Sequence, residues 1–250
     1  AIFGPDYRAD PYAGLGEEVA GGVAKRHRLD SAILAQTRRL IVYTPRGRGG
    51  EALPCLYLQD GVAYYRLAKL HLVMEKLLSD GLIRPAHLVF VEPKKRREEY
   101  GFNPSYEAFM VEELLSFVED KLETTGERLA MGASLGGLVS ALLAWKHPEL
   151  FATVITQSGA FLGSPEKPNA YRNEASWLLE RVQQEGPKPL RWYMACGTLE
   201  WLIEVNRKLA RALDEGGYDY DYKERNAGHN WVNWRNGLSG ALRFALPPQP

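Results

Sequence analysis

Cysteine and histidine are scarce in this sequence, with 2 and 5 occurrences among 250 residues. Cys55 and Cys196 both lie in apolar runs that are typical of strands, so we expect buried free thiols rather than a disulfide. The sequence has no Cys-x-x-Cys pair that would indicate a zinc site. A chain of this length can bury a large hydrophobic core without cross-links. The sequence therefore predicts a protein that needs no metal and no cofactor.

An excess of charge of either sign is also lacking. Lysine plus arginine and aspartate plus glutamate each number 31, so the formal net charge is zero. A nucleic-acid-binding protein usually carries a basic excess. The balance argues against nucleic acid as a partner and leaves only a local basic patch open.

Long hydrophobic runs are missing as well. The longest apolar stretches are well short of the roughly 20 residues that cross a bilayer. Residues 1–22 contain no apolar core of the signal-peptide type. We therefore expect a cytoplasmic protein with no membrane partner. The sequence leaves open its oligomeric state and whether a leader once preceded Ala1.

Short apolar or β-branched runs alternate with longer stretches of helical spacing. Strands are expected at residues 39–44, 53–58, 86–91, 128–131, 153–156, 190–195 and 218–222. Helices are expected at residues 67–78, 109–122, 135–145, 201–213 and 231–246, with Gly126 as a stop signal after the second. This alternation predicts an α/β fold, a three-layer sandwich around a mostly parallel sheet. The strict polar alternation of residues 218–222 predicts an edge strand.

The domain organisation is expected to be simple. The sequence shows no internal repeat, low-complexity tract or linker that would divide it. We therefore expect one domain over residues 1–250, with residues 1–22 as an N-terminal extension. Residues 162–174 are rich in Gly, Ser, Pro and Asn, and are expected to form a surface loop or a short cap over a site.

The most informative motif is a Gly-x-Ser-x-Gly pattern between a predicted strand and a predicted helix. It consists of Gly132, Ser134 and Gly136. A serine nucleophile must be exposed where a base can reach it, and a sharp strand-to-helix turn does this only if glycines leave room for the backbone. The pattern alone also occurs in ordinary packed turns, but its position here favours a catalytic serine. The N-terminus of the following helix would also favour developing negative charge.

A serine nucleophile of this kind needs a histidine and an acid later in the chain. His229 lies in a loop between the last strand and the last helix, whereas His147 ends the helix that follows Ser134. His229 is therefore the expected base. Glu200 follows the strand at residues 190–195 and is the favoured acid, with Glu204 as the alternative. Either glutamate could instead be an ordinary acid near a helix N-terminus.

The tetrahedral intermediate of such a reaction needs N–H donors for its oxyanion. One donor is expected to be the backbone N–H of Leu135, directly after the nucleophile. The second should come from the loop after an early strand, where Gly61 permits a tight turn. The N–H of Gly61 and the N–H of Val62 are both candidates.

Eight motifs across residues 23–245 are similar to those of the putative esterase (esterase D) family of α/β-hydrolases. They are Arg39–Pro45, Leu58–Gly61, Arg96–Tyr100, Glu112–Leu115, Met131–Gly137, His147–Phe151, Gln157–Phe161 and Gly228–Arg235. The last of these resembles the enterobactin (enterochelin) esterase branch in particular. The resemblance implies an ester hydrolase that uses Ser134 and His229. Many relatives carry Asp where this chain has Glu200, which leaves the third member of the triad open.

The resemblance also implies a substrate. It suggests a small-molecule ester, in particular the trilactone of an anionic ferric siderophore, bound by Arg96 with Asp60 and Trp231 nearby. Carbohydrate-linked feruloyl or acetyl esters are the alternative within the same family, and a non-catalytic binding protein is a third hypothesis. The basic run at residues 94–97 fits an anionic ligand, or is a solvated loop balanced by the two glutamates that follow it. Trp201, Trp231 and Trp234 could line the site or pack in the core, and the core is favoured for Trp234.

Overall fold

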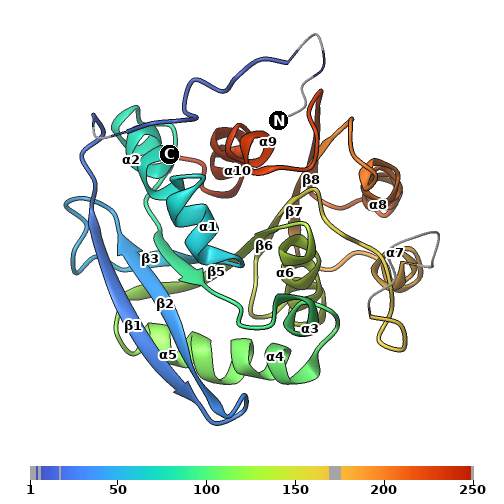
Figure 1. Cartoon of the computed structure of the whole chain (residues 1–250), viewed down its shortest axis with the longest axis horizontal. Coiled ribbons are helices and arrows are strands. Elements are labelled where there is room, and N and C mark those ends of the chain that lie inside the picture. The colour runs from blue at the N-terminus through green and yellow to red at the C-terminus, as the bar shows by residue number, and fades with distance from the viewer. Residues whose placement is uncertain (1–3, 5–6, 17, 169–175, 249–250) are drawn as a thin grey trace.

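The computed structural model describes residues 4, 7–16, 18–168 and 176–248. In this part of the chain, a twisted sheet of eight strands runs through the centre of the molecule (Figure 1). The strands, in chain order, are β1 (Val23–Ser31), β2 (Gln36–Thr44), β3 (Leu53–Leu58), β4 (His87–Val91), β5 (Thr124–Ala133), β6 (Thr153–Gln157), β7 (Arg191–Gly197) and β8 (Tyr220–Arg225).

The strand order in the sheet is β1-β2-β4-β3-β5-β6-β7-β8. Strands β4, β3, β5, β6, β7 and β8 are parallel to one another, whereas β1 and β2 form an antiparallel hairpin, and β2 pairs antiparallel with β4. The expected mostly parallel sheet is thus confirmed, and so is the edge position of the last strand. The carboxyl ends of the parallel strands meet at one edge, where an α/β sheet usually carries its site.

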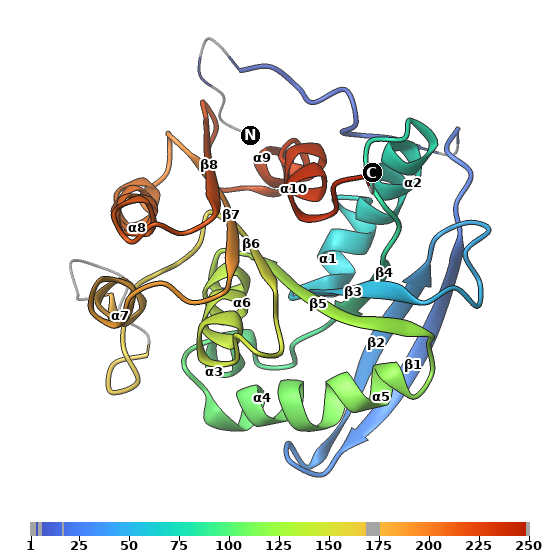
Figure 2. The ribbon, with the colours of Figure 1, turned by 180° about the vertical axis from the view of Figure 1, so that it is seen from behind.

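Helices cover both faces of the sheet (Figure 2). They are α1 (Gly61–Arg66), α2 (Leu70–Ser79), α3 (Arg96–Glu99), α4 (Pro104–Ala108), the π-helix η1 (Phe109–Leu114), α5 (Leu115–Glu119), α6 (Leu135–Lys146), α7 (Trp177–Glu185), α8 (Ile203–Glu215), α9 (Trp231–Arg235) and α10 (Leu238–Ala245). One hydrophobic core lies under α4 to α8, and a second lies under α1, α2, α9 and α10. This is the expected α/β-hydrolase sandwich.

The sequence missed or misplaced several elements. Strand β1 is polar and largely exposed, so it has no apolar run to reveal it. The helix expected at residues 231–246 is two helices, α9 and α10, separated at Asn236 and Gly237. Gly126 does not stop a helix, because α5 already ends at Glu119 and Gly126 lies within β5 at a φ of 79°. The short helices α1, α3 and α7 were also not expected.

The segment before β1 packs along α10 and α2 (Figure 1). The backbone N–H of Asp10 donates to Asn236 Oδ1 over 2.8 Å, and the hydroxyl of Ser239 donates to the Asp10 carboxylate. The Tyr12 hydroxyl donates to Asp80 on the last turn of α2 over 3.0 Å. Residues 7–16 are therefore fixed to the second core face by polar contacts.

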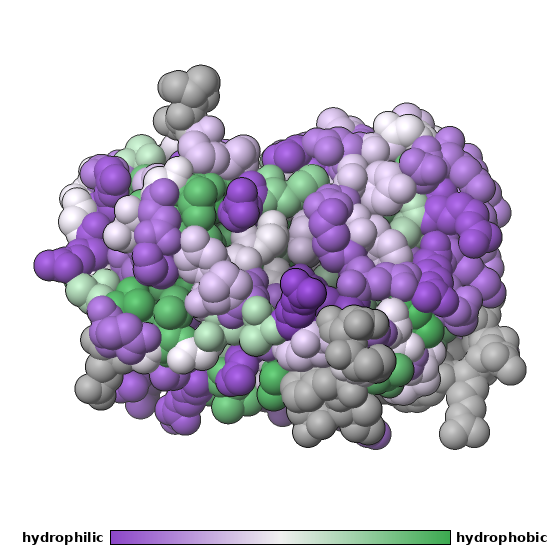
Figure 3. Space-filling view, turned by 90° about the horizontal axis from the view of Figure 1, so that it is seen from above, coloured by the Kyte–Doolittle hydropathy of each residue, from purple (hydrophilic) through white to green (hydrophobic). Residues whose placement is uncertain are grey.

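Two further expectations concern the surface. Of the loop expected at residues 162–174, residues 162–168 are irregular, and the remainder lies outside the described residues. On the face seen in Figure 3, hydrophobic residues form small groups separated by hydrophilic ones. Within the described part of the chain, no helix has both the length and the apolar character needed to cross a bilayer.

Candidate active site

Ser134 occupies the turn between β5 and α6 in a strained backbone conformation. Its φ is 57° and its ψ is −122°, values that non-glycine residues rarely adopt. The turn is so tight that a Cβ atom on Gly132 would lie 2.2 Å from the carbonyl carbon of Gly136. The glycine spacing of the motif is therefore a steric requirement of the turn, which presents the serine at the carboxyl edge of the sheet.

His229 lies within hydrogen-bonding distance of Ser134. Its Nε2 is 3.0 Å from Ser134 Oγ, and its Nδ1–H donates to the carboxylate of Glu200. The three side chains come from the loops after β5, β7 and β8. The structure thus joins three residues, far apart in the sequence, into one hydrogen-bonded chain that has the arrangement of a Ser-His-acid triad.

Glu200 is buried and held by several donors. Its Oε1 accepts hydrogen bonds from Ser158 Oγ and from the backbone N–H of Gly197, each over 2.6 Å. Burial tends to raise the pKa of Glu200, but the hydrogen bonds from His229, Ser158 and Gly197 outweigh it, so that the pKa lies below its ordinary value. Glu200 is therefore ionised at neutral pH, as a residue that orients an imidazole must be.

Ser158 and Trp234 support this carboxylate and were not singled out for that role from the sequence. The indole N–H of Trp234 donates to Ser158 Oγ over 2.9 Å, and the Ser158 hydroxyl in turn donates to Glu200. Trp234 is only 8% exposed, which agrees with the core position favoured for it. The signals for Ser158 were its place directly after β6, at the same edge as Ser134, and its inclusion in the motif Gln157–Phe161.

The alternative acid and the alternative base lie elsewhere. Glu204 is exposed on α8, where its carboxylate pairs with Arg207 over 2.9 Å. His147 caps the far end of α6, and its Nε2 contacts Glu107 at 2.9 Å. The geometry therefore favours Glu200 over Glu204 and His229 over His147.

The expected oxyanion donors lie at the N-termini of two helices. Leu135 begins α6 and Gly61 begins α1, so neither N–H has a helical acceptor. The N–H of Val62 donates to Glu92 Oε2 over 3.0 Å, and burial raises the pKa of this glutamate. A Cβ atom on Gly61 would lie 2.4 Å from the backbone of Phe90, so only glycine fits there. The N–H of Val62 is therefore already engaged, and the N–H groups of Leu135 and Gly61 stay the candidate donors.

Arg96 lies beside the nucleophile turn but is engaged with Asp60. Its guanidinium donates two hydrogen bonds of 2.7 Å to the Asp60 carboxylate, and a third, of 3.2 Å, to the carbonyl of Ala133. Asp60 has a left-handed backbone conformation with a φ of 56°, and its N–H donates to the hydroxyl of Tyr100 over 2.8 Å. Two of the three residues expected to bind substrate, Arg96 and Asp60, thus form an ion pair next to the nucleophile turn.

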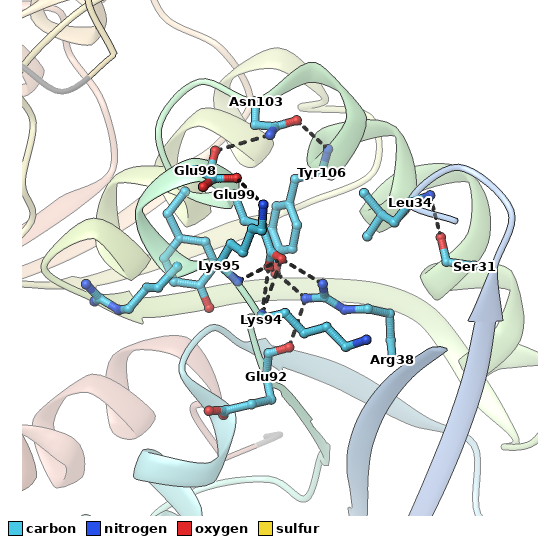
Figure 4. A network of polar contacts seen from close by, with 12 residues as sticks. Ser31, Leu34, Arg38, Glu92, Lys94, Lys95, Glu98, Glu99, Asn103 and Tyr106 are labelled. Atoms are coloured by element: carbon cyan, nitrogen blue, oxygen red, sulfur yellow. Dashed lines mark hydrogen bonds and ion pairs between the residues drawn. The ribbon is translucent and has the colours of Figure 1, made fainter. Parts of the chain in front are cut away.

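A buried ion pair fixes the loop that carries Arg96. Arg38, on β2, donates two hydrogen bonds of 2.8 and 2.7 Å to Glu99 on α3, and both side chains are nearly inaccessible to solvent (Figure 4). The Glu99 carboxylate also accepts from the backbone N–H groups of Lys94 and Lys95. The backbone at the start of the basic run, residues 94–97, is therefore held in a turn by the Glu99 carboxylate.

Aromatic side chains surround His229. Its ring centroid lies 5.0 Å from that of Trp234 and 6.0 Å from that of Trp201. Trp231 packs edge-on against Trp234 at 4.9 Å, and Trp201 is 57% exposed. Within the described residues, no group of three or more His, Cys, Asp and Glu side chains is arranged to hold a metal ion. The site therefore offers a candidate triad with an ionised glutamate, lined by aromatic rings.

Known proteins resemble the chain in sequence and fold. A family model described as putative esterase matches residues 31–245. The chain is 27% identical over 236 residues to the uncharacterized protein YjcH of Bacillus subtilis (strain 168), covering 90% of this chain and 98% of that protein. It is 27% identical to the iron(III) enterobactin esterase of Escherichia coli (strain K12), covering 84% of this chain and 54% of that protein.

Solved structures also resemble the chain in fold. A ferulic acid esterase structure superposes with a TM-score of 0.78 at 21% identity, covering 90% of this chain and 98% of that one. The chain spans about half the length of the E. coli enterobactin esterase. The family match, which covers most of the sequence, agrees with the resemblance carried by the sequence motifs. The chain therefore belongs to the putative esterase family of carboxylic ester hydrolases.

Proposed function

We propose that this chain hydrolyses carboxylic esters through an acyl-enzyme, with Ser134 as nucleophile, His229 as general base and Glu200 as the residue that orients the imidazole. The observation that carries the proposal is the continuous hydrogen-bonded chain from Ser134 Oγ through His229 to Glu200. The roles follow from the chemistry of each group. A hydroxyl needs a base, and an imidazole needs a fixed tautomer.

The proposed reaction has two stages. Ser134 Oγ attacks the ester carbonyl carbon while its proton passes to His229 Nε2, and the tetrahedral intermediate collapses as the imidazolium protonates the leaving alcohol. Water then attacks the acyl-serine, with His229 again accepting and returning the proton. The carboxylate of Glu200 stabilises each imidazolium. The N–H groups of Leu135 and Gly61 are proposed to stabilise the oxyanion at both stages.

The proposed substrate is a small ester that carries anionic groups, with a siderophore ester of the enterobactin type as the first candidate. The enterobactin esterase named above supports this candidate, as does the cationic side chain of Arg96 near Ala133. Because Arg96 is paired with Asp60, it would bind an anion only by sharing or exchanging that partner. The cytoplasmic location expected from the sequence stays a prediction.

The nucleophile is tested by Ser134→Ala. We expect kcat on a p-nitrophenyl ester to fall by roughly 10⁴- to 10⁶-fold, because the acyl-enzyme can no longer form. A fluorophosphonate probe should label the native chain and not the variant, while circular dichroism shows that both are folded. Retained turnover or labelling in the variant would exclude Ser134 as nucleophile.

The substrate class is tested with a panel of esters. Ferric enterobactin, feruloylated and acetylated sugars, and simple acyl esters are compared by kcat/KM on the native chain, with Ser134→Ala as the blank. The proposal expects the siderophore ester to be preferred. A preference for feruloyl or acetyl sugars would replace the proposed substrate while leaving the proposed chemistry intact.

A further inference from the structure

A groove lined by arginines runs beside the candidate active site. It has a volume of about 490 Å³. Arg26 and Arg28 reach it from β1, Arg39 from β2 and Arg66 from α1. We call these four residues with the space between them the arginine groove. All four side chains are exposed. A local concentration of positive charge thus exists on a chain whose formal net charge is zero.

The arrangement of these arginines works against the stability of the hairpin. Arg28 and Arg39 are directly paired in the register of β1 and β2, and like charges in opposed positions destabilise a strand pair. In contrast, Arg38, one residue along β2, lies on the opposite side of the hairpin and is neutralised by Glu99. The repulsion between Arg28 and Arg39 has no structural role in the hairpin. Such a local violation of folding rules is expected at a functional site, here one where a ligand supplies negative charge.

The carboxylates of Asp30 and Glu92 accept hydrogen bonds from groups other than these arginines. Arg26, Arg28, Arg39 and Arg66 form no ion pair within 4.0 Å in the described part of the chain. The Asp30 carboxylate, on β1, accepts from the Thr37 hydroxyl, and Glu92, at the inner end of the groove, accepts from Val62. The four guanidinium groups are thus available for an external anion.

The groove adjoins the loop that carries the candidate oxyanion donor Gly61. Val62 and Glu92 line its inner end, and Val62 follows the glycine proposed as an oxyanion donor. The register that pairs Leu40 with Val91 places Arg39 alongside Glu92 at the carboxyl edge of the sheet. Ile41 and Phe90 form part of the groove wall. The remote end of an extended substrate whose ester carbonyl is at Ser134 would reach these residues past the N-terminus of α1.

We propose that the arginine groove binds a cluster of oxyanions, such as carboxylates or phosphates, at the end of the substrate remote from the ester bond. This inference rests on the proposed esterase function, because it treats the groove as an extension of that site. Guanidinium groups suit this role because their planar donor pairs match the oxygen spacing of carboxylate and phosphate. Arg96 is outside the groove and paired with Asp60, so the groove is a second, separate determinant of charge specificity.

The test uses the double variant Arg28→Gln/Arg39→Gln. Its matched control is Arg211→Gln/Arg243→Gln, which removes two exposed arginines from α8 and α10. Both proteins are assayed on a p-nitrophenyl ester whose acyl chain ends in a tricarboxylate, and on the neutral triamide of the same shape. We expect KM for the tricarboxylate to rise at least about tenfold in the groove variant alone, because each hydrogen bond to a charged group contributes about 1.5 kcal/mol or more.

The other outcomes contradict the proposal. An equal rise for both esters would show that the arginines support the catalytic loop, and an unchanged KM for the tricarboxylate would show that they do not contact substrate. The thermal midpoint provides a second readout, since removing the opposed charges should leave the variant at least as stable as the native chain.

A binding measurement separates this proposal from the proposed chemistry. Pyrophosphate is titrated by calorimetry into Ser134→Ala, with and without Arg28→Gln/Arg39→Gln. Binding that needs the arginines would support an oxyanion site even if Ser134 proved not to be the nucleophile. Binding of pyrophosphate together with an unchanged KM for the tricarboxylate ester would assign the groove to a free anion and overturn the proposal for substrate.

Discussion

At the scale of single residues, the candidate site contains strained backbone conformations that neighbouring hydrogen bonds hold in place. Ser134 and Asp60 both have left-handed φ values, which cost a non-glycine residue of the order of 1 kcal/mol or more. Each donates a hydrogen bond to a neighbouring group: the Ser134 N–H to the Gln157 carbonyl, and the Asp60 N–H to the Tyr100 hydroxyl. Such strain persists where the surrounding contacts over-determine the conformation, as they do in this pair of turns.

The identity of the acid gives a sharp prediction. Glu200→Gln should lower kcat by about 10²- to 10⁴-fold, because a neutral amide no longer stabilises the imidazolium and can select the wrong tautomer. Glu204→Gln should leave kcat unchanged, because its carboxylate lies on the surface against Arg207. The two variants are measured side by side on the same p-nitrophenyl ester. A larger loss in Glu204→Gln would reverse the assignment.

A smaller effect on kcat is expected from a change at Ser158, which contacts Glu200. Ser158→Ala removes a hydrogen bond of 2.6 Å to Glu200 and leaves the indole N–H of Trp234 without its acceptor. We expect kcat to fall about tenfold with KM little changed, since the loss of one charged hydrogen bond loosens the carboxylate without touching substrate. Ser158→Thr, which keeps the hydroxyl, should recover most of the rate. A change in KM alone would point to a different role.

At the scale of elements, the sequence predicted the buried strands and missed the exposed one. Strands β3 and β6 consist of buried residues, so their apolar runs predicted them well, whereas β1 alternates charged residues on a hairpin face that has little core to cover. The break between α9 and α10 was invisible because the apolar spacing continues across it. An apolar pattern in the sequence indicates a buried strand. Because β1 is largely exposed, its sequence contains no such pattern.

The residues of the candidate site also divide into those that the sequence predicted and those that it did not. Ser134 and His229 were predictable because their motifs describe the local backbone and the chain order. The choice between Glu200 and Glu204 was not decided by sequence, because both follow β7 within a few residues and only burial separates them. The role of Ser158 depends on contacts with two distant segments, and a sequence contains no record of such contacts.

The buried pair of Arg38 and Glu99 predicts a specific pattern of stabilities. Glu99→Gln should lower the free energy of unfolding by about 3–5 kcal/mol, because it leaves the buried guanidinium of Arg38 without a counter-charge. The double variant Arg38→Met/Glu99→Leu should be much less destabilised, since both charges are then removed. Denaturant unfolding monitored by circular dichroism measures both. A double variant as unstable as Glu99→Gln would mean that packing, rather than charge, dominates.

The pair of Arg38 and Glu99 also predicts how acid changes the stability of the chain. Burial tends to raise the pKa of Glu99, but hydrogen bonds from Arg38 and from Lys95 and Lys94 outweigh it and hold the pKa below its ordinary value. A lowered pKa means that this contribution to stability is present above about pH 4.3 and is lost as the pH falls through the folded-state pKa. The native chain should therefore lose stability below about pH 4 more steeply than Arg38→Met/Glu99→Leu. Equal slopes in denaturant titrations at several pH values would contradict this.

At the scale of the whole molecule, the two cores share one sheet. Cys55 and Tyr57 face the core under α4 to α8, and the alternate residues Leu56 and Leu58 face the core under α1, α2, α9 and α10. Each central strand therefore loses half of its buried surface if either helix layer departs. The candidate triad lies at the edge of this shared sheet, so its geometry depends on both layers at once.

This sharing leads us to propose that the chain unfolds as the single domain expected for residues 1–250. We expect a single transition in urea in which far-UV circular dichroism, which reports all helices, and tryptophan fluorescence have the same midpoint. Leu242→Ala, in the core on the α10 side, should destabilise the chain by about 2–5 kcal/mol and shift both signals together. Trp145 and Trp192 lie in the other core, whereas Trp234 lies in the core of Leu242 and Trp231 packs against it. The fluorescence is therefore recorded in a Trp231→Phe/Trp234→Phe background, where it mainly reports the face that the mutation does not touch. If the fluorescence midpoint stayed in place while the helical signal moved, the two layers would be separate folding units, and the triad would depend on only one of them.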